Sequence, residues 1–500
     1  MFDLIIKNGK IIDGTGNVPY FADLGIKDGK ISKIAKELSG GEVIDVSGFC
    51  VTPGFIDSHS HSDTDFLSFP EQKEKIEQGI TVSVGGQCGG SRYPFIDENG
   101  VHKTVGDFFD VCSNMTFGSH LTMLCGHCNI RRMVMGIEDR YATAEEIEKM
   151  KELLRENIRC GAQGISFGLI YTPSCSASTE ELIALAKVAA EEGAIVTAHI
   201  RNEGDTLIEA CEEFINVIKE SGATGVLSHH KAMGEKNHGK VLKTLEMIDA
   251  ANEEGADIYM DVYPYTASHT GLAARFVPKE YRAIGVRKAL SDPKMREEIY
   301  KWDLETYGDK LDWVLITSCP AYPQYEGLRL PKAAALHKKT PYETVYDMLI
   351  ESDGAGYGCY FMADENDLKR VLAHPRCMVG TDGEVAADRA VFHPRIRGTF
   401  PRVLGKYIRE EKVLPLVDII RKITSLPARI YGIKNKGLLL EGFDADICIF
   451  DEEKIIDKAT YTDFRAKCEG LEYVVLGGVV AARDGVFTGE KRANVLLRNK

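Results

Sequence analysis

The sequence predicts an α/β fold: a (β/α)8 barrel with a small β-sandwich built from both termini and an insertion between the seventh and eighth barrel strands. Eight short apolar runs alternate with helical patterns in the middle of the chain, as expected for parallel strands joined by crossover helices. Both ends instead alternate β-type runs with turns. The 500 residues also exceed what one hydrophobic core usually supports, which favours an appended unit.

The two ends are expected to fold together as the β-sandwich, from residues 1–50 and 434–500. Residue pairs that favour positive φ and tight hairpins lie between the β-type runs; they are Asn8-Gly9, Asp28-Gly29, Gly477-Gly478 and Asp484-Gly485. Each end alone is too short to bury a core. The barrel, at residues 51–433, would therefore be inserted between them.

The barrel strands are expected in the eight apolar runs, which are 52–61, 81–88, 120–127, 164–171, 195–200, 225–230, 257–265 and 377–382. Thr143 and Glu146 form a capping-box pattern before a helix that ends at Gly161. The seventh and eighth runs are more than 100 residues apart, too far for one crossover helix. We expect a lid or subdomain there, at about 266–340.

Composition excludes several classes of protein. The net charge is −14 and the basic clusters are short, which argues against nucleic acid and anionic membranes as partners. No apolar run is long enough to span a bilayer, and the N-terminus lacks the pattern of a secretion signal, so a cytoplasmic location is expected. The thirteen scattered cysteines are expected to be reduced thiols. The sequence carries no signal for the oligomeric state.

Six of the eight predicted strands end in residues that bind metal ions or transfer protons. These residues are His59 with His61, Cys88, His127, His199, His229 with His230, and Asp382. The carboxyl ends of all strands of a (β/α)8 barrel meet at one mouth, where active sites are built. The sequence therefore predicts a metal centre at this mouth.

The strongest ligand candidates combine histidine with cysteine. His59 and His61 lie on the same face of a strand because side chains alternate, and they follow PGFID at the end of a buried strand. Cys88 is flanked by glycines; alone it would be interpreted as a buried thiol, but as a thiolate it suits zinc together with His199 and His229.

The other candidates have two interpretations each. Of the adjacent histidines, His229 is expected to face the mouth and His230 the helices. His127 is expected either to position substrate or to be a hydrogen-bonded structural histidine. Asp382, followed by glycine, suits a weak metal ligand and general base, but aspartate after a strand is also a common helix N-cap.

Taken together, the motifs resemble a known family. The order NGKIIDG, VTPGFIDSHSH, Cys88, two later histidines, TDG and GFDADICIFD resembles the amidohydrolase superfamily. The motifs GGQCGGS, AHIRNE, SHHKA, DVYPYTAS and HPRIRGTFPRVLG resemble, more narrowly, the N-acyl-D-amino-acid deacylases, or D-aminoacylases, over essentially the whole chain. The resemblance implies a (β/α)8 barrel with a β-sandwich, and zinc-dependent hydrolysis of an N-acyl-D-amino acid to a carboxylate and a free D-amino acid.

The resemblance also implies roles for individual residues. The tightly bound zinc would take Cys88, His199 and His229, while a second, weaker metal position would take His59, His61 and Asp382. Asp382 would remove a proton from water and deliver it to the leaving nitrogen. The substrate carboxylate would be held by Lys231, Tyr263 and Arg395, and the Tyr263 hydroxyl would also stabilise the tetrahedral oxyanion.

Two departures from the family leave the substrate side chain open: GEVAADRAVFHPR replaces a histidine- and proline-rich segment after TDG, and His269 stands where a small hydroxyl residue is usual. One alternative is an amidohydrolase for a cyclic amide (hydantoin or dihydropyrimidine type) or a dipeptide. Lys231 and Arg395 favour a substrate with a free carboxylate. A non-catalytic scaffold protein on the same fold is the other alternative, against which the retained ligand set argues.

Overall fold

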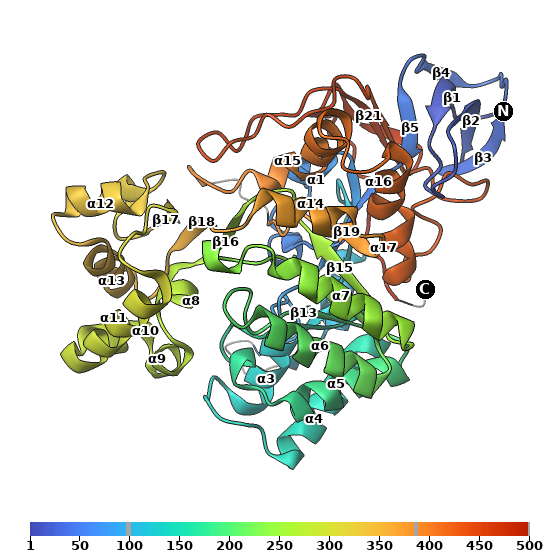
Figure 1. Cartoon of the computed structure of the whole chain (residues 1–500). Coiled ribbons are helices and arrows are strands. Elements are labelled where there is room, and N and C mark those ends of the chain that lie inside the picture. The colour runs from blue at the N-terminus through green and yellow to red at the C-terminus, as the bar shows by residue number, and fades with distance from the viewer. Residues whose placement is uncertain (97–101, 385–388, 499–500) are drawn as a thin grey trace.

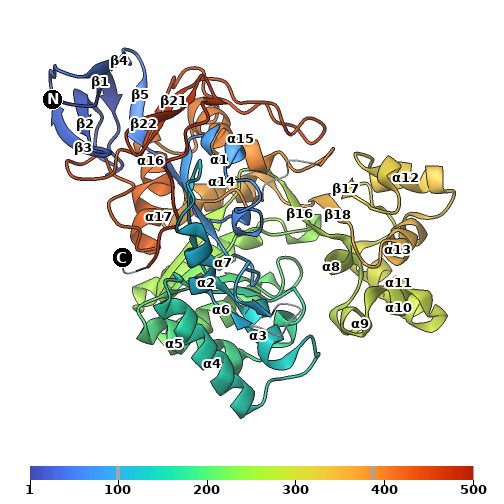
Figure 2. The same cartoon turned by 180° about the vertical axis from the view of Figure 1, so that it is seen from behind.

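The computed structural model describes residues 1–96, 102–384 and 389–498. Two opposite views show a central α/β unit with a sheet of terminal strands on one side and a mostly helical unit on the other (Figures 1 and 2). The N-terminus lies at the terminal sheet, in blue, and the described part of the chain ends near the orange helix α17 (Figure 1).

Parallel strands form the central unit, and each of the eight apolar runs contributes to them. In chain order they are β6 (Phe55–Asp57), β7 (Ile80–Gly85), β10 (His120–Met123) with β11 (Cys125–Gly126), β12 (Gly164–Gly168), β13 (Ile195–His199), β14 (Thr224–Leu227), β15 (Asp257–Val262) and β19 (Cys377–Val379). They pair in the orders β6-β7-β10 and β11-β12-β13-β14-β15-β19.

The last of these strands, β19, lies beside the first, β6. Ser58 N donates to Val379 O at 3.3 Å, and Asp382 N donates to His59 O at 2.7 Å. Leu124 N, between β10 and β11, donates to Gly85 O at 3.0 Å at the end of β7. The carboxyl ends of the first and last strands therefore lie side by side.

Helices connect the strands, and α4 to α7 stand in a row beside them (Figure 1). The connecting helices are α1 (Lys73–Ile76), α2 (Val105–Cys112), α3 (His127–Met135), α4 (Ala144–Arg159), α5 (Thr179–Glu191), α6 (Leu207–Ser221), α7 (Lys240–Glu253) and α14 (Glu365–Ala373). Helix α4 begins with the expected capping box, because Thr143 and Glu146 bond reciprocally. It buries Met150, Leu154 and Ile158, which share one face at helical spacing.

In the described residues after the last parallel strand there are four helices: α15 (Arg395–Arg402), the π-helix η5 (Val403–Glu410), α16 (Leu416–Ile423) and α17 (Ser425–Ile430). The remaining short elements are η1 (Ser62–Thr64), η2 (Ser174–Ser176), η3 (Glu235–Asn237), η4 (Pro323–Tyr325), β8 (Phe95–Ile96) and β9 (His102–Lys103). All thirteen cysteines carry free thiols. Within the described ranges, no helix has the length and apolar character needed to cross a membrane.

Strands from both ends of the chain form one sheet. They are β1 (Leu4–Ile11), β2 (Tyr20–Lys27), β3 (Lys30–Ala35), β4 (Glu42–Asp45), β5 (Cys50–Pro53), β20 (Ile447–Phe450), β21 (Leu471–Leu476), β22 (Val479–Arg483) and β23 (Val486–Phe487). The antiparallel pair β5-β20 joins the N-terminal and C-terminal strands. Pairing runs continuously through this single nine-stranded sheet.

One of the expected hairpin turns, at Asn8-Gly9, does not form a turn. Asn8 and Gly9 lie inside β1, where the register with β2 shifts between Ile6 and Gly9. Asn8 still has a positive φ of 60°, which is the conformation that a residue such as asparagine tolerates. The sequence correctly indicated the backbone conformation, but it marks a β-bulge, not a turn.

The insertion between β15 and β19 has its own sheet and core. Its sheet pairs β16 (Ala267–Gly271), β18 (Tyr357–Phe361) and β17 (Val314–Ser318) in that order, all antiparallel. Its helices are α8 (Leu272–Phe276), α9 (Lys279–Ile284), α10 (Val286–Ser291), α11 (Pro293–Tyr307), α12 (Leu330–His337) and α13 (Pro341–Glu351). The insertion is longer than the expected 266–340, because β18 pairs with both of its other strands and extends it to Phe361.

Candidate metal centre and active site

All six predicted metal ligands lie at the carboxyl ends of the parallel strands. Their ligand atoms form two groups, within each of which the atoms lie within 4.8 Å of one another: His59, His61, Cys88 and Asp382, and Cys88, His199 and His229. Cys88 belongs to both groups. The strand ends thus bring together residues that are up to 323 positions apart, as the pairing of Ser60 with Gly383 illustrates.

Cys88 lies at the centre of this arrangement. Its Sγ is 3.3 Å from His59 Nε2 and 3.3 Å from His229 Nε2. A tetrahedral zinc ion with a sulfur and a nitrogen ligand would separate those two atoms by about 3.5 Å. Burial would raise the pKa of the thiol, but His59 and His229 lower that pKa well below its usual value. The thiolate, the form that binds zinc, is therefore favoured.

The backbone around Cys88 is shaped by glycine. Cys88 has a φ of +53°, and Gly86 and Gly89 on either side also have positive φ. A Cβ on Gly86 would lie 2.2 Å from Leu124 O, and one on Gly89 would lie 2.6 Å from Gly168 N. Only glycine fits at these two positions, so the GGQCGG sequence is what lets this loop present the thiol next to the neighbouring strands.

His199 has the surroundings of a metal ligand. It is buried, and neither ring nitrogen has a hydrogen-bond partner among the described residues. Burial lowers the pKa of His199, which keeps the imidazole neutral, the form that coordinates metal ions. A buried unpaired polar group is costly, and a zinc ion held with Cys88 and His229 would give it a partner. The residues present therefore fit the metal.

His59, His61 and Asp382 form the other side of the centre. Asp382 Oδ1 lies 3.0 Å from His61 Nε2 and 3.6 Å from His59 Nε2. Burial would raise the pKa of Asp382, but Arg395, whose Nη1 donates to Oδ2 at 2.6 Å, lowers that pKa well below its usual value. Asp382 does not cap a helix: the next described helix, α15, has Pro394 as its N-cap.

Two acidic residues that the sequence interpretation missed hold these histidines. Asp261 on β15 accepts from His229 N at 2.7 Å, and its other oxygen lies 3.2 Å from His59 Nδ1. Glu203 Oε1 lies 3.0 Å from His229 Nδ1 and pairs with Lys231. The sequence did contain a signal for Asp261, because it is a charged residue inside the apolar run of β15. The signal for Glu203 was its place in the AHIRNE motif, four residues after His199.

The three predicted substrate-binding residues line a cavity of about 210 Å³, named here the metal cavity. Lys231 Nζ lies 5.4 Å and the Arg395 guanidinium 5.0 Å from the centre of the Tyr263 ring. The Tyr263 hydroxyl is buried and has no hydrogen-bond partner in the described ranges. Lys231 is paired with Glu203 and Arg395 with Asp382, so both cations have carboxylate partners within the chain.

The remaining histidines have distinct places. His127 is fully buried outside the metal cavity, bonded to Ser174 and, through Nε2, to Glu181 at 2.9 Å, which makes it a structural residue. The side chain of His230 does not line the metal cavity: its Nε2 lies 2.7 Å from Thr244 Oγ1 on α7. His269 lines the metal cavity, and burial, followed by the charge of Arg395, lowers its pKa well below the usual value.

Part of the segment that departs from the family lies outside the described residues, namely 385–388. On either side of this gap, Glu384 and Phe392 line the metal cavity. The His269 ring packs against Phe392 with 4.6 Å between ring centres, and its Nε2 lies 2.9 Å from Thr317 Oγ1. The two features that departed from the family pattern therefore meet at one wall of the cavity.

The chain is similar in sequence and in structure to known proteins. A model of the amidohydrolase family matches residues 42–288 and 329–482. The D-aminoacylase of Alcaligenes xylosoxydans xylosoxydans is 34% identical over 99% of this chain and 98% of its own length. The structure of an N-acyl-D-glutamate deacylase from Bordetella bronchiseptica with zinc and a phosphonate inhibitor is 33% identical, covers 99% of both chains and has a TM-score of 0.85. A D-aminoacylase structure, described by its binuclear metal centre, is 32% identical, covers 100% of both chains and has a TM-score of 0.86.

Proposed function

Because the chain belongs to the amidohydrolase family, we propose that it is a zinc-dependent enzyme that hydrolyses N-acyl-D-amino acids to a carboxylate and a free D-amino acid. The observation that carries the proposal is Cys88, whose sulfur lies 3.3 Å from both His59 Nε2 and His229 Nε2, beside His199, whose ring nitrogens have no hydrogen-bond partner among the described residues. The relatives support it: similar proteins are named D-aminoacylase and N-acyl-D-glutamate deacylase, and one of their structures holds zinc.

The chain offers two metal positions. Cys88, His199 and His229 would hold the tightly bound zinc, and His59, His61 and Asp382 would line a second, weaker position. When bound, zinc polarises the amide carbonyl and increases the acidity of water. The binuclear centre named for a similar D-aminoacylase supports two positions. Asp261 would fix the orientation of the His59 ring through its Nδ1, as a carboxylate beside a ligating histidine commonly does.

Asp382 is the proposed general base. Arg395 and His61 keep its carboxylate ionised, and its position beside His59 and His61 supports a role at the proposed weaker metal position. It would take the proton of the attacking water and pass it to the leaving nitrogen.

Lys231, Tyr263 and Arg395 are proposed to bind the substrate. The Arg395 Nε–H group and the Tyr263 hydroxyl are buried without partners in the described residues, so both have donors to offer. Arg395 and Lys231 would hold the α-carboxylate, with Tyr263 between them, and the tyrosine hydroxyl would also donate to the tetrahedral oxyanion.

The test of this proposal is a release assay with N-acetyl-D- and N-acetyl-L-amino acids and zinc. We expect D-amino acids to be released, and Asp382→Ala to lower kcat by about 10²- to 10⁴-fold while the tight zinc stays bound. Asp309→Ala, a change in the insertion, should leave kcat unchanged. Unchanged turnover in Asp382→Ala would refute the role of Asp382, and zinc-free protein would favour the scaffold alternative.

A second candidate is hydrolysis of a cyclic amide or a dipeptide. Lys231 and Arg395 in the metal cavity favour a substrate with a free carboxylate, which argues against hydantoins and dihydropyrimidines. Turnover of hydantoin without turnover of any N-acetyl-amino acid would favour the cyclic-amide hydrolase over the N-acyl-D-amino-acid deacylase.

The finer architecture is part of the proposal. We describe the eight parallel strands as a (β/α)8 barrel at residues 51–433 and the terminal strands of 1–50 and 434–500 as the β-sandwich domain. The hydrogen bonds from Ser58 to Val379 and from Asp382 to His59 support a closed barrel. The cytoplasmic location stays a prediction from the sequence.

A further inference from the structure

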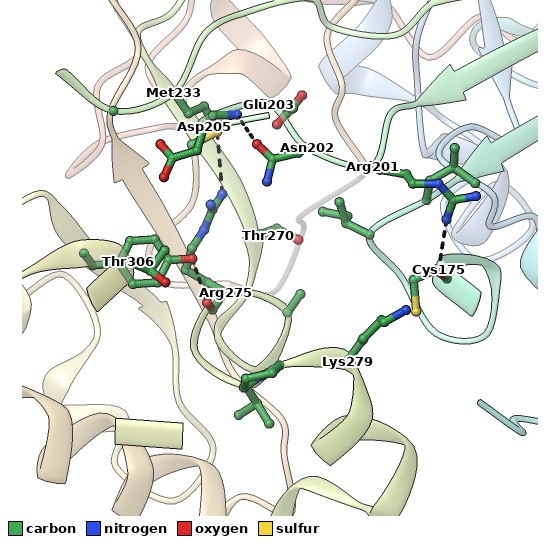
Figure 3. A pocket seen from close by; sticks show the side chains of 18 of the residues that line it. Cys175, Arg201, Asn202, Glu203, Asp205, Met233, Thr270, Arg275, Lys279 and Thr306 are labelled. Carbon is green, nitrogen blue, oxygen red and sulfur yellow. Dashed lines mark hydrogen bonds between the residues drawn. The ribbon is translucent and has the colours of Figure 1, made fainter. Parts of the chain in front are cut away.

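The metal centre has an open side and a closed side. The open side faces the metal cavity and, next to it, a second cavity of about 470 Å³. His199 and Glu203 line both cavities, and Figure 3 shows Glu203, Thr270 and Arg275 among the side chains of the second one. Cys88 is not among the described residues that line either cavity. The position of its thiol is therefore set by the chain on the closed side.

The loop that presents this thiol has an unusual backbone. Residues 86–92, named here the cysteine loop, lie within the described ranges and form neither helix nor strand. Gly86, Cys88 and Gly89 have positive φ angles of 71°, 53° and 75°. A non-glycine residue with positive φ is uncommon, and strained backbone persists only where the surrounding structure holds it. The cysteine loop therefore depends on contacts from other segments.

Asp63 makes two of these contacts from the segment that carries His59 and His61. It follows His61 by two residues, in η1, and it is buried. Its Oδ1 accepts a hydrogen bond from Gly86 N, and its Oδ2 accepts one from Arg92 N, both at 2.9 Å. One carboxylate therefore holds the first and the last residue of the cysteine loop.

The chain leaves room for this carboxylate beside the loop. A Cβ on Gly85, the last residue of β7, would lie 2.8 Å from Asp63 Oδ1 and 2.9 Å from Asp63 Cβ. Arg92 Nη1 donates to Thr64 O at 2.8 Å, which adds a third hydrogen bond between the same two segments. Glycine at position 85 is thus what allows Asp63 to reach the loop.

A serine on another strand holds the middle of the cysteine loop. Ser166 on β12 is fully buried, and its Oγ accepts from Gly89 N at 3.0 Å and donates to Gly86 O at 2.6 Å. These two hydrogen bonds lie on either side of Cys88 in the sequence. Asp63 has a further consequence, because it joins the loop to the segment that carries other candidate metal ligands.

We infer that Asp63 is a positioning residue of the metal centre: its carboxylate, together with the Ser166 hydroxyl, sets the place of the Cys88 thiolate relative to His59 and His61. Cys88 belongs to both groups of candidate ligands, and its Sγ lies 3.3 Å from His59 Nε2. A displaced loop would therefore change both metal positions together. The inference rests on the proposed function, which assigns zinc to these ligands.

The test is Asp63→Asn, which keeps the size of the side chain but replaces one acceptor by an amide donor. That amide would face either Gly86 N or Arg92 N, so one of the two hydrogen bonds is lost. We expect the zinc affinity, measured by competition with a chelator, to fall about 10- to 100-fold. In the cobalt-substituted protein, the sulfur-to-cobalt charge-transfer absorption, which reports the bond from Cys88, should weaken.

Asp23→Asn is the matched control. Asp23 on β2 is also buried and also holds two backbone amides: Oδ1 accepts from Asn8 N at 2.9 Å, and Oδ2 accepts from Leu38 N at 2.8 Å. None of the candidate metal ligands belongs to its sheet. Both substitutions should lower the Tm by a similar amount, but Asp23→Asn should leave the zinc affinity and the cobalt spectrum unchanged.

Ser166→Ala decides if Asp63→Asn does not fold. It removes the hydrogen bonds to Gly89 N and Gly86 O and leaves Asp63 in place. We expect the zinc affinity to fall about 3- to 10-fold, as the loss of neutral hydrogen bonds predicts, and the charge-transfer absorption to weaken. An unchanged affinity and an unchanged spectrum in this variant would then overturn the inference.

The outcomes separate the inference from the proposed function. An unchanged zinc affinity and cobalt spectrum in Asp63→Asn, or changes of the same size in Asp23→Asn, would overturn the inference while the deacylase function stands. Wild-type protein that binds neither metal ion, or that binds zinc but hydrolyses no N-acyl-D-amino acid, would instead overturn the proposed function.

Discussion

Lys75 offers the sharpest test of how the site is held together. It belongs to α1 and is fully buried, and its ammonium donates to Asp57 Oδ2 at 2.7 Å, Ser60 Oγ at 2.9 Å and Thr381 Oγ1 at 3.0 Å. Ser60 lies between His59 and His61, and Thr381 directly precedes Asp382. Lys75 therefore ties the two chain segments that carry the proposed weaker metal position.

The substitution Lys75→Met removes one partner of a buried ion pair and leaves the other. Asp57 keeps hydrogen bonds from Thr381 N and Oγ1, each at 2.7 Å, but its buried charge loses its counterion. Removing one partner of such a pair costs about 3 to 5 kcal/mol. We expect this loss in the free energy of unfolding. We also expect kcat to fall by about 10- to 100-fold, because displacement of Asp382 by about 1 Å costs that much.

The assay is a urea titration followed by circular dichroism, since both tryptophans, Trp302 and Trp313, lie in the insertion and would report on it alone. Lys149→Met is the matched control: its pair with Glu145, at 2.8 Å, is nearly as short as the 2.7 Å pair of Lys75 with Asp57 but is exposed, so this substitution should leave the free energy of unfolding almost unchanged. The double substitution Lys75→Met with Asp57→Asn removes both charges and should recover part of the loss. Equal stability of Lys75→Met and Lys149→Met would refute the reasoning.

Three further predictions concern the Cys88 thiol, the buried Asp261 carboxyl at the metal centre and the buried Asp303 carboxyl in the insertion. Cys88→Ser should lose the tightly bound zinc during dialysis, because serine offers no thiolate. The control is Cys112→Ser, at a buried thiol whose pKa burial raises to about 12, and this variant should retain the zinc. Metal analysis of both variants measures the zinc content, and full zinc in Cys88→Ser would contradict the proposed ligand set. Asp261→Asn should weaken metal binding about 10- to 100-fold, measured by competition with a chelator, because it loosens His59, a proposed metal ligand; an unchanged affinity would contradict this role of Asp261. Burial raises the pKa of Asp303 from 3.8 to about 8, so the folded protein keeps a proton that the unfolded chain releases, and this contribution to stability is present below about pH 4 and is lost as the pH rises to about 8. The Tm of the wild-type protein relative to Asp303→Asn should therefore fall between pH 5 and 8, and parallel Tm curves would contradict the raised pKa.

The sequence located every central strand, because a strand buried on both faces is a continuous apolar run. It was less reliable where pairing between distant residues decides the structure. The run 357–361 is β18 of the insertion, and it pairs antiparallel with strands that begin at Ala267 and Val314. Nothing local in those five residues indicates such partners, so the insertion was expected to end too early.

The sequence predicted the candidate metal ligands but not the charged residues that hold them in place, and the two outcomes have different reasons. Histidine and cysteine at strand ends are uncommon enough to be noticed, and the carboxyl ends of the predicted barrel strands are expected to converge. Lys75, Asp261 and Glu203 belong to residue types that are mostly exposed and unremarkable in a sequence. Their burial and pairing depend on tertiary packing, which no local pattern encodes.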